Sequence, residues 1–375
     1  MIVLAGAGWT AETRGDDAFR ELRDDWEDLY HRCPAASPFQ SYGWLDAWWH
    51  AYAEPGRLRL VLIRRDGRLV AAAPLMLSHR AGTRVLVPLG GTLADYTEVL
   101  IADDLAGPAA RALADALLRE PGWRAIDLPE TRPGATTGTA FWDAWPGHRY
   151  RIASSVCQHL PALPWDDFVA SLPGRQRRHA RHALVTLNRS GLVRHEVTAG
   201  EADRAVPELL RLHALQWRGR GINPEHLTEE FAAYLGRAVT AMLAAGQAVL
   251  VEHRDGDRVK TSHLAFVGHD ALDGYLYGAD PALRRGMDLT VMMLADAVPR
   301  AHRLGLSAMS FLRGEEPYKD RWRPQRERNE RVLLIRPGSP AGMAYALRVR
   351  AWRAAVAAAK KHAPWLRTVR DRIRA

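Results

Sequence analysis

One order of secondary-structure elements occurs twice in this chain, and the repeat restricts the folds that it can adopt. The segments LRLVLIRRDGRLVAAAPLMLS (58–78) and AVLVEHRDGDRVKTSHLAFVG (248–268) each contain an apolar strand, a turn with Asp-Gly and a returning strand. This pattern predicts two β-hairpins. Further along, residues 112–130 and 293–314 each contain an amphipathic helix followed by a short strand. The Asp-Gly turns lie 189 residues apart and the late helices 181, so we infer a duplicated unit.

The repeated order also predicts the class of fold. A hairpin requires antiparallel pairing, and a helix between two strands of one sheet implies a parallel crossover. We therefore expect an α/β protein with two tandem mixed sheets, helices on both faces of each sheet, and a C-terminal basic helix. The boundaries that follow are 1–155 for the first unit, 156–335 for the second, and 336–375 for a linker and a tail helix.

Hydrophobic periodicity predicts the remaining elements. In the first unit it predicts helices at 17–31, 41–53 and 108–119, and strands at YTEVLI (96–101) and WRAIDLP (123–129). In the second unit it predicts strands at 193–200, 272–280 and 306–313, and helices at 206–221, 227–246 and 288–303. A further helix is predicted between the units, at 172–191.

The net charge of +9 is concentrated at the C-terminus. Residues 336–375 hold ten Lys or Arg and one acid, and the other 335 residues hold 42 basic and 42 acidic side chains. The folded body is therefore neutral, and we expect no DNA among the partners. The basic tail helix is amphipathic, which suits an anionic membrane, RNA or packing on the body. The arginine-rich segment 172–191 is either a solvated face or a site for the phosphates of CoA or tRNA.

Several features favour a cytoplasmic location. The chain has only two cysteines, Cys33 and Cys157, and no apolar run of the ~18 residues that a membrane span needs. Its first residues lack the basic region of a signal peptide and soon become acidic. The tail leaves open a peripheral contact with the inner face of the membrane. The pair His179 and His182 has no further ligand nearby, so we expect no metal.

Four segments carry a resemblance to a known family. They are PFQSYGWLDAWWHAY (38–52), LADYTEVL (93–100), LHALQWRGRG (212–221) and FLRGEEPYKDRW (311–322). The order of elements resembles the GNAT N-acetyltransferase fold, and the four segments together resemble the CelD/BioF-type acyltransferases. That family has tandem GNAT units and is related to the Fem aminoacyltransferases of peptidoglycan synthesis. The resemblance covers about residues 20–330, and Ser310 departs from it where the family has Asp before FLRG.

The resemblance implies that the second unit holds an acyl-CoA donor. In a GNAT fold the pyrophosphate lies at the N-terminus of the helix that follows the central strand, where backbone N–H groups and the helix dipole favour anions. Here that stretch is DPALRRGMDLTVMML (280–294). Arg284 and Arg285 suit phosphate, Gly286 allows close approach of the backbone, and Arg313 at the end of the last strand is a further candidate.

The family's glycine-rich pattern is incomplete in this stretch. Leu283 stands where a basic or amide residue is usual, and Asp288 replaces the second small residue. An Asp at a helix start is an ordinary cap and repels phosphate, so a plain capped helix is the alternative. Aminoacyl-tRNA, the donor of the Fem relatives, is then the alternative donor.

The charged cluster after the last strand is the candidate catalytic site, since ligands of open α/β sheets lie at the carboxyl ends of strands. Lys319 would neutralise negative charge, Glu316 would accept a proton from an amine, and Tyr318 would donate one to the leaving group. His263, on the returning strand of the second hairpin, is a further candidate base. The alternatives are a solvated turn with i,i+4 ion pairs for the cluster and a core histidine for His263.

Candidates for binding the acceptor come from both units. In the second unit they are His213, Trp217 and Arg218 on one helix and Tyr275 and Tyr277 on the central strand. In the first unit the residues that carry the family's marks, and would help to close an acceptor cleft, are Gln40, Trp44, Asp95 and Tyr96. Packing in the core is the alternative for the aromatic residues.

We therefore expect an acyltransferase that moves an acyl group from acyl-CoA to a primary amine of a small-molecule, cell-envelope or natural-product acceptor. Neither cysteine has a His partner with an orienting third group, and no G-x-S-x-G occurs, which favours direct transfer. Two alternatives stay open. One is an aminoacyl-tRNA-dependent transferase that forms an amide or ester, and the other is a non-catalytic accessory module of polysaccharide synthesis.

Overall fold

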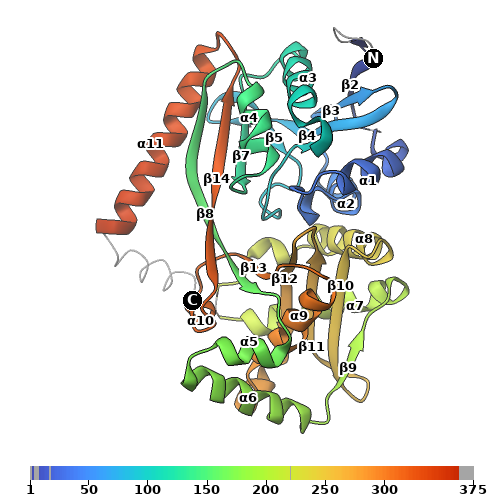
Figure 1. The fold of residues 1–375 in the computed structure, drawn as a ribbon, viewed down its shortest axis with the longest axis vertical. Helices are drawn as coiled ribbons and strands as arrows, with labels where there is room; N and C mark the ends of the chain where they lie inside the picture. Colours follow the sequence, from blue (N-terminus) through green and yellow to red (C-terminus); the bar gives the residue numbers. More distant parts are fainter. Residues whose placement is uncertain (1, 4–7, 17, 220, 363–375) are drawn as a thin grey trace. The chain divides into compact units, whose positions relative to one another are not determined.

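The computed structural model describes residues 2–3, 8–16, 18–219 and 221–362 (Figure 1). The chain divides into two compact units. One is formed by Met1–Ser155 together with the segment that begins at Arg328, and the other by Val156–Glu327. Each unit contains both helices and a mixed sheet, so the expected α/β class is confirmed.

The first unit contains the first of the two predicted hairpins. Its strands are β1 (Ile2–Val3), β2 (Trp9–Arg14), β3 (Leu58–Arg65), β4 (Arg68–Arg80), β5 (Thr83–Pro88), β6 (Leu100–Ile101) and β7 (Ala125–Thr131). Its helices are α1 (Arg23–His31), α2 (Tyr42–Tyr52), α3 (Ala106–Arg119), α4 (Ala140–Ala144) and α11 (Pro340–His362). The strand order is β1-β2-β3-β4-β5-β7-β14, in which β14 is Gln325–Ile335, with β6 on β4, and β5 and β7 are parallel.

The second unit repeats this arrangement. Its strands are β9 (Val193–Glu196), β10 (Ala248–Asp255), β11 (Arg258–Val267), β12 (Ala271–Ala279) and β13 (Ala308–Arg313). Its helices are α5 (Trp165–Ser171), α6 (Gly174–Asn188), α7 (Ala202–Trp217), α8 (Glu229–Ala244), α9 (Leu289–Arg303) and α10 (Pro317–Asp320). The strand order is β8-β13-β12-β11-β10-β9, in which β8 is Arg149–Pro161, with β12 and β13 parallel. Each sheet thus has a hairpin, a third antiparallel strand, a parallel strand reached through a helix, and a last antiparallel strand.

Two long strands that the sequence analysis did not predict run from one unit into the other. β8 (Arg149–Pro161) begins in the first unit, and from Val156 on its residues belong to the second, where they pair with β13. β14 (Gln325–Ile335) begins in the second unit, and from Arg328 on it belongs to the first, where it pairs with β7. Residues 328–335 were expected in the second unit. They belong to the first unit instead, because their backbone pairs with β7 and completes that sheet.

A strand expected in the first unit is also different. The segment YTEVLI forms only the two-residue strand β6, which pairs with β4. The parallel partner of β7 is β5, which follows β4 after a tight turn. That turn contains Ala81 and Gly82, and both have positive φ. Because an Ala rarely adopts this conformation, the end of β4 at this turn was not predictable from the residue types alone.

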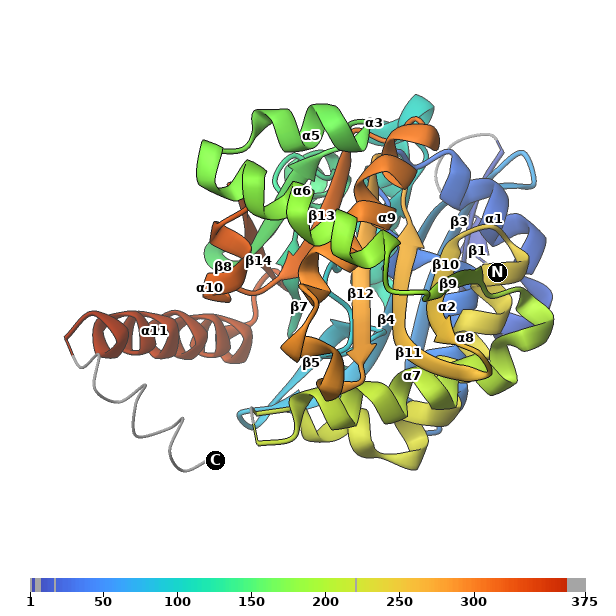
Figure 2. The same ribbon diagram turned by 90° about the horizontal axis from the view of Figure 1, so that it is seen from below.

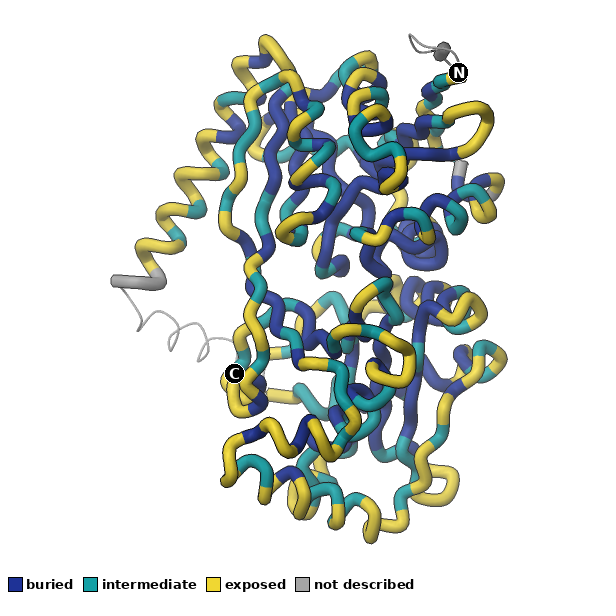
Figure 3. Tube along the Cα trace, viewed as in Figure 1, coloured by how far each residue is buried: buried dark blue, intermediate teal, exposed yellow. Residues whose placement is uncertain are grey.

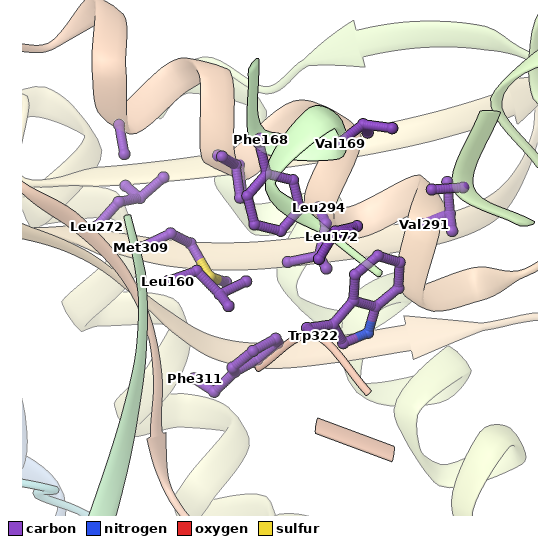
Figure 4. Close-up of a cluster of buried hydrophobic side chains, with 14 of the residues drawn as sticks. Leu160, Phe168, Val169, Leu172, Leu272, Val291, Leu294, Met309, Phe311 and Trp322 are labelled. Atoms are coloured by element: carbon purple, nitrogen blue, oxygen red, sulfur yellow. The ribbon is translucent and has the colours of Figure 1, made fainter. Parts of the chain in front are cut away.

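Helices cover both faces of the second sheet. Figure 2 shows α7 and α8 on one face and α5, α6 and α9 on the other. The second group closes over a core of buried side chains, of which Phe168 from α5, Leu294 from α9 and Trp322 are fully enclosed (Figure 4). Burial of these large apolar groups fixes α9 on the sheet and so places its N-terminus.

Burial differs along the chain. Figure 3 shows that the strands of each unit are largely buried, whereas α11 carries a run of exposed residues. Within the described ranges, none of the helices combines the length and the apolar character that crossing a bilayer requires. The same residues contain no group of three or more His, Cys, Asp or Glu side chains placed to hold a metal ion.

Candidate active site

The site begins where two parallel strands of the second unit separate. β12 and β13 pair only from Ala271 and Ala308 to Asp273 and Ser310. Beyond these residues both strands continue, but no longer pair with each other. Each strand also has an irregularity here: one in β12, where its pairing with β11 shifts register, and one in β13 between Ser310 and Arg313. Such separation and bulging re-aim side chains and give a ligand room between the strands.

The bulge in β13 contains a residue in an unusual conformation. Leu312 has φ of 55°, in the left-handed region that side chains other than glycine rarely adopt. Its N–H donates to the hydroxyl of Ser310, at 3.0 Å, and Ser310 is fully buried. Ser310 stands where the sequence resemblance led us to expect Asp. Its short side chain accepts this hydrogen bond and so stabilises the bulge. Local strain of this kind is typical of functional sites.

A glycine brings helix α7 close to β12. A Cβ added to Gly278 would lie 2.6 Å from the backbone nitrogen of His213 and 2.8 Å from the oxygen of Leu209, both on α7. Only a residue without a side chain allows this approach. The contact places the last turn of α7, with His213 and Trp217, beside the free end of β12.

A cavity of about 770 Å³ opens at the carboxyl ends of these strands, within the size range of small-molecule sites. Its wall comes from α6, the end of α7, Tyr277 of β12, the loop before α9, the first turns of α9, and α10. Of the residues predicted from the sequence, those that line this cavity are Trp217, Tyr277, Arg284, Arg285, Gly286, Glu316 and Tyr318.

Asp288 occupies the N-terminus of α9. Its carboxylate accepts hydrogen bonds from the N–H groups of Thr290 and Val291, at 2.9 and 3.2 Å. The same carboxylate is 2.8 Å from His179 Nε2 and accepts from Arg321 at 3.1 Å. Burial alone would raise the pKa of Asp288, but His179, Arg321 and the two N–H groups outweigh it and hold that pKa below its usual value. An anion therefore already fills the place where a GNAT helix holds pyrophosphate.

Two other arginines of the cavity wall are free of carboxylates. Arg284 and Arg285 are exposed, and neither has an ion-pair partner among the residues that the structure describes. They lie at the end of a short 3₁₀ turn, Pro281–Arg285, which Asp280 caps through the N–H of Ala282. This loop therefore presents positive charge to the cavity, even though the carboxylate of Asp288 occupies the N-terminus of α9.

Lys319, the leading catalytic candidate, is buried beneath the turn that follows β13. Its side chain is 4% exposed, and its Nζ lies 2.7 Å from Glu316 Oε2. It also donates at 3.4 Å to the carbonyl oxygens of Phe311, Arg313 and Gly314. Lys319 does not line the cavity. In this arrangement its ammonium holds the end of β13 and orients Glu316, and a direct catalytic role for it stays a prediction.

Glu316 and Tyr318 reach the cavity from this turn. The Glu316 side chain is 45% exposed despite its ion pair with Lys319. The Tyr318 ring is 41% exposed and stands edge-on to Phe311. Partial burial and the negative charge of Glu316 raise the pKa of Tyr318 to about 12, so its hydroxyl is protonated at neutral pH. The pair thus offers one proton acceptor and one proton donor to the same space.

Two histidines lie in series beside Trp217. His213 Nδ1 is 2.9 Å from the carbonyl oxygen of Tyr277, so it is the donor in the neutral ring. Its Nε2 is then an acceptor for His226 Nδ1, at 3.3 Å. Burial lowers the pKa of both rings, to about 4 for His226. His213 is therefore a neutral group that fixes α7 on β12.

A second cavity, of about 830 Å³, shares Trp217 with the first. It is lined by the end of α7 and by the 3₁₀ turn Pro224–Leu227 with the loop before it. Arg218, predicted to bind the acceptor, lies in its wall and has no ion-pair partner within the described part of the chain. Ile222 and Leu227 supply apolar surface. One aromatic side chain thus borders two adjoining spaces.

Besides Lys319 and His213, three further predicted residues of the second unit lie outside both cavities. His263 is 6% exposed in the middle of the sheet, and burial lowers its pKa to about 4. Tyr275 packs on Phe266, with ring centroids 4.9 Å apart. Arg313 pairs through its backbone with Cys157 of β8. The positions of His263 and Tyr275 agree with the packing alternatives, and a role of Arg313 in binding the donor stays a prediction.

Of the four candidates from the first unit, Gln40, Trp44 and Tyr96 are buried in its core and Asp95 is half-buried. Gln40 donates from Nε2 to the carbonyl oxygen of Tyr96, at 3.0 Å, and both residues are buried. Trp44 is fully buried against Phe39. The carbonyl oxygen of Asp95 accepts from Asn329 of β14, at 3.4 Å. What the structure shows for these residues is packing and hydrogen bonding, and their role in binding an acceptor stays a prediction.

Sequence reasoning missed several residues of the cavity wall, which are His179, His182, Thr186, Gln216, Met287 and Arg321. Three of them lie on α6, which the sequence analysis described only as an arginine-rich helix that is either a solvated face or a phosphate-binding site. Arg321 stands within the quoted segment FLRGEEPYKDRW, so the charge of that segment was a usable signal. The pairing of His179 with Asp288 across 109 residues had no local signal at all.

Comparison with known proteins gives one family match, which lies within the second unit. Residues 174–320 match the family model described as an acetyltransferase (GNAT) domain. The match spans α6 to α10 and so includes the separated strands and every segment of the cavity wall. No match was found among curated proteins.

Solved structures share the fold over most of the chain. FemX superposes with a TM-score of 0.61 at 12% identity, covering 87% of this chain and 97% of that one. The C-terminal domain of a putative lysylphosphatidylglycerol synthetase from Agrobacterium fabrum gives a TM-score of 0.55 at 11% identity, covering 88% and 96%. L-PGS from Bacillus licheniformis gives 0.53 at 10% identity, covering 87% and 95%.

These likenesses extend over both units and show a shared fold. The more specific resemblance to CelD/BioF-type enzymes rests on the four quoted sequence segments and stays a prediction. The match to an acetyltransferase domain, which falls within the second unit, and the shared fold together support an acyltransferase.

Proposed function

We propose that the second unit transfers an acyl group from acyl-CoA to a primary amine. The observation that carries the proposal is the separation of β12 from β13 beside a cavity whose wall holds Arg284 and Arg285. A donor with an uncharged acyl arm and a phosphate-rich end fits this polarity, because the arm would enter between the strands and the phosphates would meet the two arginines. The match to an acetyltransferase domain supports the same donor.

The side chains at the cavity fit a direct transfer. The amine nitrogen attacks the thioester carbonyl carbon, a C–N bond forms, and the C–S bond to CoA breaks. Glu316 would take the proton that the amine loses, since its carboxylate faces the cavity. Tyr318 would give its proton to the departing thiolate, because its raised pKa keeps it protonated. Lys319 would hold Glu316 in place.

The cavity beyond Trp217 suits the acceptor. A transferase must bring two substrates together, and Trp217 borders both spaces. Arg218 would pair with an anionic group of the acceptor, and the apolar residues Ile222 and Leu227 would contact its body. We therefore propose an amine acceptor that also carries a carboxylate or phosphate.

Calorimetric titration with CoA and acetyl-CoA tests the donor. Micromolar binding is expected for the wild-type protein and a loss of at least about tenfold for the variant in which Arg284 and Arg285 are both Ala. Arg303→Ala, an exposed arginine at the far end of α9, is the matched control and should bind as the wild type does. Absence of CoA binding by the wild-type protein would reject this donor.

A second candidate is an aminoacyl-tRNA-dependent transferase, and one observation favours it. Asp288 fills the helix N-terminus that holds pyrophosphate in a GNAT fold. The exposed arginines of α6 would then dock the tRNA backbone, since no acidic residue occurs from 174 to 195. Transfer from charged tRNA in a single turnover, weakened by Arg178→Ala with Arg181→Ala, would support this candidate.

The acetyltransferase match counts against the third alternative, a non-catalytic accessory module.

A further inference from the structure

Helix α11 is buried at its start, and further along its arginines still contact the first unit, as Arg353 does by donating to the hydroxyl of Ser154 at 3.0 Å. A Cβ on Gly342 would lie 2.4 Å from the carbonyl oxygen of Arg124, so the first turn sits directly on the first unit. Tyr345 donates from its hydroxyl to Asp127, at 2.5 Å, and Ala346 is fully buried. These contacts fix the direction of the helix. Beyond Ala346 no described residue of α11 is buried.

The part of the helix beyond Ala346 exposes large apolar side chains. Leu347 is 54% exposed and Trp352 is 70% exposed, the highest exposure given for a large hydrophobic residue in the described ranges. Around Leu347 runs a row of exposed alanines with helical spacing, Ala344, Ala351, Ala354 and Ala358. A soluble helix normally turns such a row inward, so the row marks a contact surface.

Arginines flank this apolar row on both sides. On a helical projection Arg348 and Arg350 fall at either edge of it. Arg348 donates to the oxygens of Ala81 and Thr83, both at 3.0 Å, and Arg350 stacks over the ring of Tyr150. Both residues are still exposed. No acidic residue occurs from 336 to 362.

We propose that the outer surface of α11, which runs from Leu347 and the alanine row past Arg348 to Trp352, docks on an anionic lipid surface. Apolar side chains would enter the boundary between headgroups and acyl chains, and the flanking arginines would meet lipid phosphates. Tryptophan is favoured in that boundary because one end of its ring is apolar and the other polar. The inference concerns the first unit and does not depend on the identity of the acyl donor.

Charge and polarity exclude the other partners. A second copy of the helix would bring like charges together, since the segment carries no acid to pair with them. RNA would satisfy the arginines but leave Leu347 and Trp352 in water, with nothing gained from the apolar row. A lipid surface satisfies both groups of residues at once.

Vesicle sedimentation tests the proposal with the full chain. The wild-type protein should sediment with phosphatidylglycerol vesicles and stay in solution with phosphatidylcholine vesicles. Leu347→Ser combined with Trp352→Ser should weaken binding by at least about tenfold, because it removes the side chains that enter the lipid. The matched control is Val193→Ser, which changes another residue that is 65% exposed and should bind as the wild type does. Circular dichroism checks that each variant is folded.

Three results would overturn the proposal. They are no binding to anionic vesicles, equal binding to neutral vesicles, and unchanged binding of the double serine variant. Displacement of the bound protein from vesicles by a short RNA at stoichiometric concentration, with the double variant still binding the RNA, would also contradict it, because the surface would then be an electrostatic site for nucleic acid.

Discussion

At the residue scale, three side chains of the charged turn after β13 have different positions and different roles. Glu316 and Tyr318 face the cavity, whereas Lys319 lies behind them with its ammonium shared between one carboxylate and three carbonyl oxygens. A lysine that uses its donors in this way supports the shape of the site. Its loss should therefore appear in stability as well as in rate.

Lys319→Met tests this division of roles. The substitution leaves three buried or partly buried carbonyl oxygens and one carboxylate without their donor, so we expect a loss of about 2–3 kcal/mol in the free energy of unfolding. Glu316→Gln keeps a hydrogen-bonding group beside Lys319 and should change stability little, while lowering turnover at least about tenfold. Chemical denaturation and acyl transfer assays would measure both. Full stability of the Lys319 variant with lost activity would instead make Lys319 a direct participant in the chemistry.

The buried histidine His263 should make the protein sensitive to acid. Its folded-state pKa is about 4, below the ordinary value of 6.5, so the unfolded chain binds a proton that the folded protein refuses. The contribution to stability is complete above about pH 6.5 and is lost as the pH falls toward 4. Between pH 6.5 and about 5, the wild-type protein should lose about 2 kcal/mol more than His263→Gln. Urea denaturation at the two pH values measures this, and an equal change in the free energy of unfolding for both proteins would contradict a lowered pKa of His263.

At the scale of elements, the position of α7 against β12 shapes the wall shared by the two cavities. Gly278→Ala would push the added methyl group into the backbone of α7 at His213 and Leu209. We expect a loss of about 1–3 kcal/mol and weaker substrate binding, because Trp217 would shift with the helix. Gly236→Ala on α8, where an added Cβ meets nothing within 4 Å, is the control and should be neutral or stabilising. Comparing melting temperatures of the two variants tests this close contact.

The elements show which parts of the fold and site a single sequence can predict. Both hairpins and the helices 41–53, 172–191 and 288–303 were predictable because their signals are local: Asp-Gly turns, capping residues and periodic apolar positions. The long strands β8 and β14 were missed, since their pairing partners lie far away in sequence. At the site, the turn after β13 was found from its charges, but the contact of His179 with Asp288 depends on packing between α6 and α9.

At the scale of the whole molecule, β8 and β14 make the two units unequal in what they require from the rest of the chain. The second unit is continuous in sequence, Val156–Glu327, and contains its own part of β8. The first unit needs the segment from Arg328 to complete its sheet. Within it, Asp127 is fully buried, and its carboxylate is held by Arg331 at 2.5 and 2.7 Å and by Tyr345. Both partners come from the returning segment.

We therefore expect the two halves to behave differently when they are produced separately. A fragment of residues 156–327 should fold and unfold cooperatively, because its sheet and core lie within it. A fragment of residues 1–155 should not, because Asp127 would keep only its longer ion pair with Arg80, at 3.7 Å, and the edge of β7 would be unpaired. Joining residues 328–362 to its C-terminus through a flexible linker should restore a cooperative transition, and the same fusion with Arg331→Ala should weaken it. Calorimetry and hydrogen exchange of the three proteins would measure this, and a cooperatively folded 1–155 fragment would mean that the returning segment is an addition to a self-sufficient sheet.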